Sequence, residues 1–99
     1  MARRTRDMRV QLAPELIKKL KKQDVRLRKS FRLAIDLFST NPNAPKLDNH
    51  ELQQEWAGFK SIDITNEWRA LYTEKKEEDE IAAYFEEIGT HEELYGRDK

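Results

Sequence analysis

The sequence contains no cysteine, only three glycines and three prolines, and no long apolar run. Without cysteine, neither a disulfide framework nor a thiolate metal site can form. A membrane-spanning helix needs about 20 apolar residues in succession, and no segment approaches that length. The basic start of the chain, residues 1–6, leads into no apolar signal region. These absences predict a cytoplasmic protein that does not enter a membrane.

What the sequence does contain is a near-equal share of charged and apolar residues, 38% and 37% of 99 residues. That mixture is typical of a compact domain with a heavily charged surface, and not of a disordered chain. A chain of this length forms one domain. We therefore expect a single domain over residues 1–99, with loose ends at residues 1–7 and 96–99.

Charge is unevenly distributed along the chain, although the net charge is zero. Residues 1–37 hold 12 Lys or Arg against 4 Asp or Glu, a balance of +8, and residues 38–99 hold 7 against 15, a balance of −8. A basic first half could follow a phosphate backbone, because binding releases condensed counterions. It could equally be the solvated face of amphipathic helices. Charge alone does not decide between these interpretations.

The first 40 residues predict a strand followed by a helical hairpin. Residues 8–12 alternate apolar and polar side chains, as in a strand with one buried face. A short helix is expected over residues 14–22, with a proline at the first helical position, where proline is tolerated. Asp24 is expected to cap a second helix of about four turns. Its apolar stripe consists of Leu27, Phe31, Ala34, Ile35 and Phe38.

The rest of the chain predicts three more strands. Residues 39–45 end the second helix, since they hold two prolines and two asparagines. Residues 47–56 have no clean period and are expected to form a loop that could include one helical turn. Strands are predicted at residues 62–64, 68–72 and 81–88.

The connections between these strands are also predicted. Every residue from 74 to 80 is charged, which favours an exposed hairpin connection. Gly89 is expected to stop the last strand, and residues 91–95 to form one helical turn. The fold class that follows is α+β: an N-terminal strand, a helical hairpin, and an antiparallel sheet of three further strands packed against the helices.

Candidate catalytic residues are few. The chain has two histidines, His50 and His91, each beside a predicted turn, where reactive side chains are usually displayed. Glu67, Trp68 and Arg69 stand at the head of a predicted strand. A carboxylate, an imidazole, a guanidinium and an aromatic ring are what cleavage of RNA by its own 2′-hydroxyl requires. Taken singly, each of these residues is more often structural, and spacing alone does not show that they meet.

Three stretches resemble the YafQ branch of the RelE/ParE superfamily of toxins: Leu47-x-x-His50-x-Leu52-x-x-x-Trp56-x-Gly58-Phe59, then Ile64, Trp68 and Leu71-Tyr72, and finally Gly89-Thr90-His91-x-x-Leu94-Tyr95. The ending Gly-Thr-His-Glu-Glu-Leu-Tyr is the most specific piece. In order of elements the resemblance covers residues 8–95. It implies a RelE-like microbial RNase fold and a toxin of a type II toxin–antitoxin system. The implied toxin is a ribosome-dependent endoribonuclease that cleaves mRNA in the ribosomal A site without a metal or other cofactor, and a cognate antitoxin holds it inactive.

The resemblance also implies roles for individual residues. His50, Glu67 and His91 match catalytic positions, with His91 as the main general acid or base. Glu67 stands where the family usually has an aspartate. Trp68 and Tyr95 match aromatic positions that would position bases.

Two cations near these positions could neutralise phosphate, Lys60 and Arg69, although Arg69 could instead support the sheet. Two acidic residues depart from the family pattern: Asp63 replaces a further histidine, and Glu87 lies where a basic residue is expected. A carboxylate beside a scissile phosphate repels it. Two alternatives therefore stay open. One is a ParE-like toxin that inhibits DNA gyrase without a catalytic histidine, and the other is a catalytically weakened member that only binds its antitoxin.

Overall fold

The structure is a computed structural model that describes residues 8–96. Its strands and α-helices within that range are β1 (Arg9–Leu12), α1 (Pro14–Lys21), α2 (Val25–Thr40), β2 (His50–Glu51), β3 (Lys60–Asp63), β4 (Trp68–Glu77) and β5 (Glu80–Thr90). Single-turn helices are η1 (Pro45–Leu47), η2 (Gln54–Trp56) and η3 (Glu92–Gly96). The predicted α+β class is confirmed. Of the ends expected to be loose, residues 1–7 and 97–99 lie outside the described residues, and Gly96 is the last residue of η3.

One five-stranded sheet has the order β1-β5-β4-β3-β2. β1 runs parallel to β5, and the other neighbouring strands are antiparallel. Four strands follow the hairpin where three were predicted, because β2 forms inside the expected loop at residues 47–56. This strand pairs His50 with Ser61 and Glu51 with Lys60. Two residues are too few to show a period in the sequence, so only the pairing partner reveals the strand.

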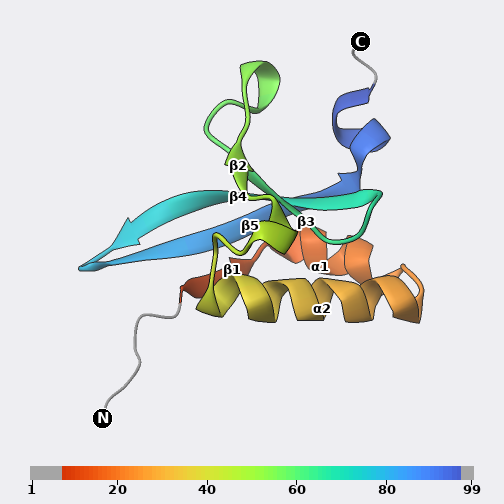
Figure 1. The fold of residues 1–99 in the computed structure, drawn as a ribbon, viewed down its shortest axis with the longest axis horizontal. Helices are drawn as coiled ribbons and strands as arrows, with labels where there is room; N and C mark the ends of the chain where they lie inside the picture. The colour runs from red at the N-terminus through yellow and green to blue at the C-terminus, as the bar shows by residue number, and fades with distance from the viewer. Residues whose placement is uncertain (1–7, 97–99) are drawn as a thin grey trace.

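Both helices lie on one face of the sheet and leave the other face open (Figure 1). Asp24 caps α2 as predicted, because its carboxylate accepts the backbone N–H of Leu27 at 2.9 Å. The centre of the core is aromatic: the Phe38 ring meets the rings of Tyr72 and Phe85 edge-on, at centroid distances of 5.0 and 5.3 Å. All three side chains are fully buried. The predicted stripe of α2 therefore packs against β4 and β5.

The β4–β5 hairpin is longer than the sequence predicted. Residues 74–80, expected to be a loop, continue both strands as far as a tight turn at Glu78 and Asp79 (Figure 1). Cross-strand contacts compensate for the charges here: the Lys75 Nζ lies 4.4 Å from the centre of the Tyr84 ring. The Arg9 guanidinium also lies 3.4 Å from the carboxylate of Glu77. A run of charge is compatible with a strand when both of its faces meet solvent.

Candidate functional site

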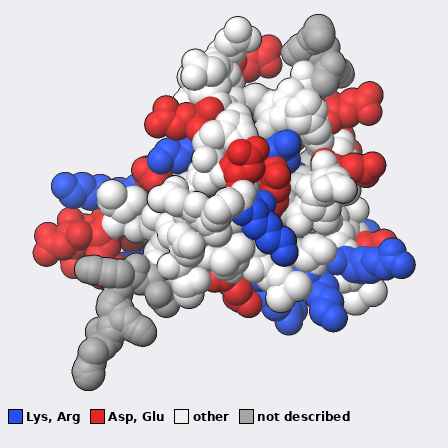
Figure 2. Space-filling view, in the orientation of Figure 1, with Lys and Arg blue, Asp and Glu red and all other residues white. Residues whose placement is uncertain are grey.

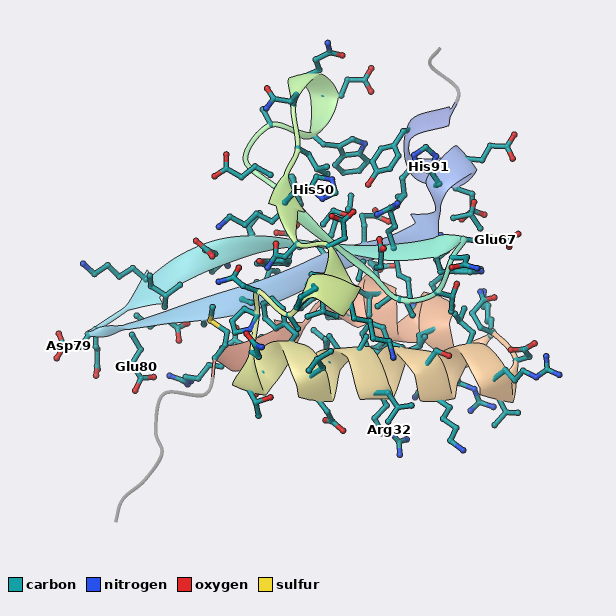
Figure 3. The ribbon with its side chains drawn as sticks, in the orientation of Figure 1. Arg32, His50, Glu67, Asp79, Glu80 and His91 are labelled. Carbon is teal, nitrogen blue, oxygen red and sulfur yellow. The ribbon has the colours of Figure 1, made fainter. Side chains whose placement is uncertain are left out.

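Two protrusions rise from the open face of the sheet, opposite the helices (Figures 1 and 3). The first is the loop that carries β2 and η2, and the second is η3. A cleft of about 370 Å³ lies between them. Its lining includes His50, Gln54 and Trp56 from the first protrusion, His91, Leu94 and Tyr95 from the second, and Arg69 from the sheet below.

His50 is held at the cleft by the backbone that precedes it. Asp48 adopts a left-handed conformation, with φ 49° and ψ 48°, and its carbonyl oxygen lies 2.7 Å from the Nδ1 of His50. A carbonyl only accepts hydrogen bonds, so Nδ1 carries the proton in the neutral imidazole. The other ring nitrogen, Nε2, is then free to take a proton.

The His50 loop is also fixed to the core. The side-chain amide of Asn49 donates to the Tyr72 hydroxyl at 2.8 Å and to the carbonyl of Pro42 at 2.9 Å. Burial raises the pKa of Tyr72 to about 12, so its hydroxyl stays protonated at neutral pH and remains able to hydrogen-bond. A buried aromatic residue thus supports a histidine on the far face of the sheet.

His91 follows directly after β5. Its backbone N–H donates to the carbonyl of Glu67 at 2.9 Å, which extends the β4–β5 pairing by one bond. The Tyr95 ring packs edge-on against the imidazole, at a centroid distance of 4.7 Å. The Tyr95 hydroxyl approaches the hydroxyl of the fully buried Ser61 at 3.4 Å. The imidazole and the phenol of the second protrusion therefore form one unit over the sheet.

Gly89 makes room for this second protrusion, and the prediction that it stops the last strand is wrong. It pairs with Arg69 inside β5, which continues to Thr90. A Cβ at Gly89 would lie 2.9 Å from the Glu93 carboxylate and 3.2 Å from the Leu94 side chain. Any side chain at this position would have to displace the Glu93 carboxylate and the Leu94 side chain, because η3 folds back closely over the strand.

Arg69 forms the positive group beneath the cleft, and it is already paired. Asp63 stands directly opposite it on β3, and the carboxylate accepts a hydrogen bond from the guanidinium. The two side chains are 20% and 30% exposed, and the Arg69 Nε has no hydrogen-bond partner among the described residues. Burial raises the pKa of the Asp63 carboxyl, an effect that Arg69 opposes. Part of the positive charge beneath the cleft is thus neutralised by the chain itself.

The structure brings together four of the seven predicted site residues, His50, Arg69, His91 and Tyr95. Trp68 is not among them, because side chains alternate along a strand; it packs against the core on the face that the helices cover. The Glu67 side chain is exposed at the start of β4, away from His50 (Figure 3). Lys60 lines a separate depression, where its Nζ lies 3.2 Å from the Glu74 carboxylate.

Glu87, the second acidic departure from the family pattern, also lies outside the cleft. It lines a depression beside α1 together with Lys18, Lys19 and Lys22. Of the two departures, Asp63 alone contacts a cleft residue, through Arg69. Of the two acidic residues, only Asp63 is therefore placed to repel a phosphate bound in the cleft.

Six of the ten residues that line the cleft were not predicted as site residues, among them Trp56 and Gln54. Trp56 donates its indole N–H to the carbonyl of Leu94 at 2.9 Å and so joins the two protrusions. Gln54 reaches the cleft from a positive φ of 57°. Trp56 stood inside the family-like motif, yet nothing in its spacing indicated a partner 38 residues away in the chain.

Within residues 8–96, no group of three or more His, Asp or Glu side chains is placed to hold a metal ion. No helix in the same range is long and apolar enough to span a membrane.

The family model of YafQ, a bacterial toxin of type II toxin–antitoxin systems, matches residues 8–96. The chain belongs to the YafQ family. It is thus a toxin of a type II toxin–antitoxin system. The predicted membership of the YafQ-like branch of the RelE/ParE superfamily is confirmed. No curated protein sequence is similar enough to count as a match.

Solved structures share the YafQ-family fold. YafQ from E. coli strain BL21(DE3) is 20% identical, with a TM-score of 0.59 over 90% of this chain and 99% of that one. A YoeB/ParE toxin from Agrobacterium tumefaciens is also 20% identical, with a TM-score of 0.67 over 85% and 99%. The archaeal RelE–RelB complex from Pyrococcus horikoshii OT3 gives a TM-score of 0.66 at 16% identity, over 86% and 96%. At these identities the likeness supports the fold of the YafQ-family chain and nothing finer.

Proposed function

We propose that this YafQ-family toxin is an endoribonuclease that cleaves mRNA in the ribosomal A site by general acid/base chemistry. The observation that carries the proposal is the meeting of His50 and His91. They come from separate protrusions and line one cleft above Arg69. Two imidazoles facing a common space over a cation are the groups that transfer of a phosphoryl group to a 2′-hydroxyl requires.

In the proposed reaction His50 is the base and His91 the acid. The free Nε2 of His50 takes the proton of the ribose 2′-hydroxyl, whose oxygen then attacks the adjacent phosphorus. His91 gives its proton to the departing 5′-oxygen, which leaves a 2′,3′-cyclic phosphate and a 5′-hydroxyl. Arg69 stabilises the extra negative charge on the phosphorane. Tyr95, beside His91, offers a ring edge and face against which a base can stack.

Glu67, Trp68 and Lys60 have no part in this proposed mechanism, because none of them lines the cleft. Glu67 contributes through its backbone carbonyl, which accepts the N–H of His91. Trp68 contributes to the core. The catalytic set is thus smaller than the sequence suggested.

We also propose two macromolecular partners, a cognate antitoxin and the ribosome. A relative of 21% identity was solved as the E. coli DinJ–YafQ toxin–antitoxin complex. On the face seen in Figure 2, Lys and Arg side chains gather on the helix side of the molecule, near the turn between α1 and α2. A basic surface of this kind favours RNA phosphates or an acidic protein segment.

Inducible expression in bacteria tests the nuclease, with wild type beside His91→Ala. The matched control is Glu92→Ala, which changes the exposed neighbour of His91. Wild type and the control are expected to arrest growth and to leave in-frame cuts when transcript 5′ ends are mapped. His91→Ala should abolish both effects while the protein stays folded.

Two other outcomes would replace the proposal. Arrest without cuts would point to a gyrase inhibitor. No arrest from soluble, folded wild type would point to a weakened nuclease that acts as an antitoxin-binding module. The Asp63–Arg69 pair is compatible with a weakened nuclease, because it lowers the positive charge available to a phosphate.

A further inference from the structure

The turn that presents His91 is closed by a reciprocal pair of hydrogen bonds. The Glu93 carboxylate accepts the backbone N–H of Thr90 at 3.1 Å, and the Thr90 hydroxyl accepts the backbone N–H of Glu93 at the same distance. This is the arrangement of a capping box, in which each residue satisfies a backbone donor of the other. The box spans residues 90–93 and therefore encloses His91.

Glu93 makes one further contact, with Lys19 on α1. The Lys19 Nζ lies 3.4 Å from the same carboxylate oxygen that accepts the Thr90 N–H. The side chains are 38% and 53% exposed, and ion pairs between exposed groups contribute little. The Thr90 hydrogen bond is also the largest cause of the lowered pKa of Glu93. The box, and not the ion pair, fixes the turn.

We propose that Glu93 is a positioning residue of the cleft, which sets the direction of the His91 and Tyr95 rings by closing the turn between them. His91 lies inside the box and Tyr95 two residues after Glu93, so one carboxylate fixes the backbone of both. A displacement of a reacting group by about 1 Å can cost roughly 100-fold in rate. The effect on cleavage rests on the proposed nuclease, and the effect on ring geometry does not.

NMR of the imidazole C–H groups reads the geometry directly, because the chain has only two histidines. Glu93→Ala is expected to shift the His91 signals and to weaken the cross-peaks between His91 and Tyr95, while the His50 signals stay in place. Glu93→Gln keeps an acceptor oxygen for the Thr90 N–H and should restore the wild-type spectrum. Glu92→Ala, on the same turn, is the matched control and should leave both histidines unchanged.

A second variant reaches the box from its other side. Thr90→Val removes the hydroxyl that accepts the Glu93 N–H and should displace the same His91 signals, which keeps the test available if Glu93→Ala folds poorly. Unchanged His91 signals and cross-peaks in Glu93→Ala and Thr90→Val would overturn the proposal.

Single-turnover cleavage of an mRNA bound to ribosomes then separates positioning from mere stability. Glu93→Ala should lower the single-turnover rate constant by about 10- to 100-fold with little change in the half-saturating concentration, and Glu93→Gln should recover most of the rate at an unchanged melting temperature. If wild type does not cleave, the proposed nuclease fails, and the NMR comparison still decides the positioning role. If wild type cleaves and Glu93→Ala cleaves equally well, the positioning role fails alone.

Discussion

The two faces of the sheet differ in what they bury. The face covered by the helices is filled by aromatic and aliphatic side chains, with Phe38, Tyr72 and Phe85 at its centre. The open face is hollow: it carries Arg69 beneath a cleft of about 370 Å³ and the side-chain-free Gly89 beneath η3. The same strands supply both faces through alternate residues. Substitutions at adjacent positions of one strand can therefore change either the packing of the core or the lining of the cleft.

Removing an aromatic ring from the filled face should have the largest effect. Phe38→Ala deletes a fully buried ring that touches two others, and we expect it to lower the free energy of unfolding by about 3–5 kcal/mol. Urea denaturation measures this loss. Leu33→Ala, on the same helix but 60% exposed, should change stability by less than about 0.5 kcal/mol. Similar losses in both variants would contradict the dominant role of the buried aromatic cluster in stability.

Removing an imidazole from the open face should lower activity and leave stability unchanged. His50→Ala should lower mRNA cleavage by about 100-fold or more, yet leave the urea midpoint close to that of wild type, because its side chain is 46% exposed. Glu51→Ala, on the same short strand, is the matched control. A fall in rate that merely tracks a fall in stability would argue against a catalytic role.

Neutralising Asp63 should sharpen the contrast between the faces. Asp63→Asn removes the negative charge that neutralises the Arg69 guanidinium, and we expect about tenfold tighter binding of a short RNA, which corresponds to about 1.4 kcal/mol. Because the Asn amide oxygen still accepts a hydrogen bond from Arg69 and burial already disfavours the charged Asp63, the free energy of unfolding should change by less than about 1 kcal/mol.

Fluorescence titration with labelled RNA and urea denaturation measure the two effects of Asp63→Asn. Asp36→Asn removes an equal charge from an exposed position on α2 and controls for net charge. Equal gains in RNA affinity from both variants would show that net charge, and not the Asp63–Arg69 pair, determines RNA binding.

Cutting the link between the protrusions should have the smallest effect. Trp56→Phe removes the hydrogen bond to the Leu94 carbonyl, which is worth about 1 kcal/mol. Hydrogen exchange of the backbone amides in residues 90–96 should accelerate, with little change elsewhere. Trp68→Phe, on the covered face, should leave those amides unaffected. Acceleration spread evenly over the sheet would mean that Trp56 acts on global stability.

Local signals made most of the fold predictable. Asp24 was recognisable as a helix cap, and the stripe of α2 follows from the period of 3.6 residues. The loop predicted at residues 74–80 was wrong, although a run of charge is typical of exposed loops. The Lys75–Tyr84 contact and the tip salt bridges depend on cross-strand partners. Such partners are set by register, which a single segment does not reveal.

The site was harder to predict, and a shift of one residue explains much of the difference. Trp68 and Arg69 are neighbours, yet they lie on opposite faces of β4. Both were predicted as site residues, because the sequence does not show which face of the strand the helices cover. The link from Trp56 to Leu94 and the pairing of Asp63 with Arg69 join separate segments. The family-like motifs contain His50, His91 and Tyr95, all of which line the cleft.

The place of β5 has a consequence for how the toxin comes into being. It is the last strand in chain order, yet it lies between β1 and β4 in the sheet. During translation β1 therefore emerges early and has no strand to pair with until residues 80–90 follow. Such long-range pairing is slow and must wait for the late segment. His91 follows β5 in the chain, so the cleft between the two protrusions cannot assemble before this strand of the sheet has been synthesised.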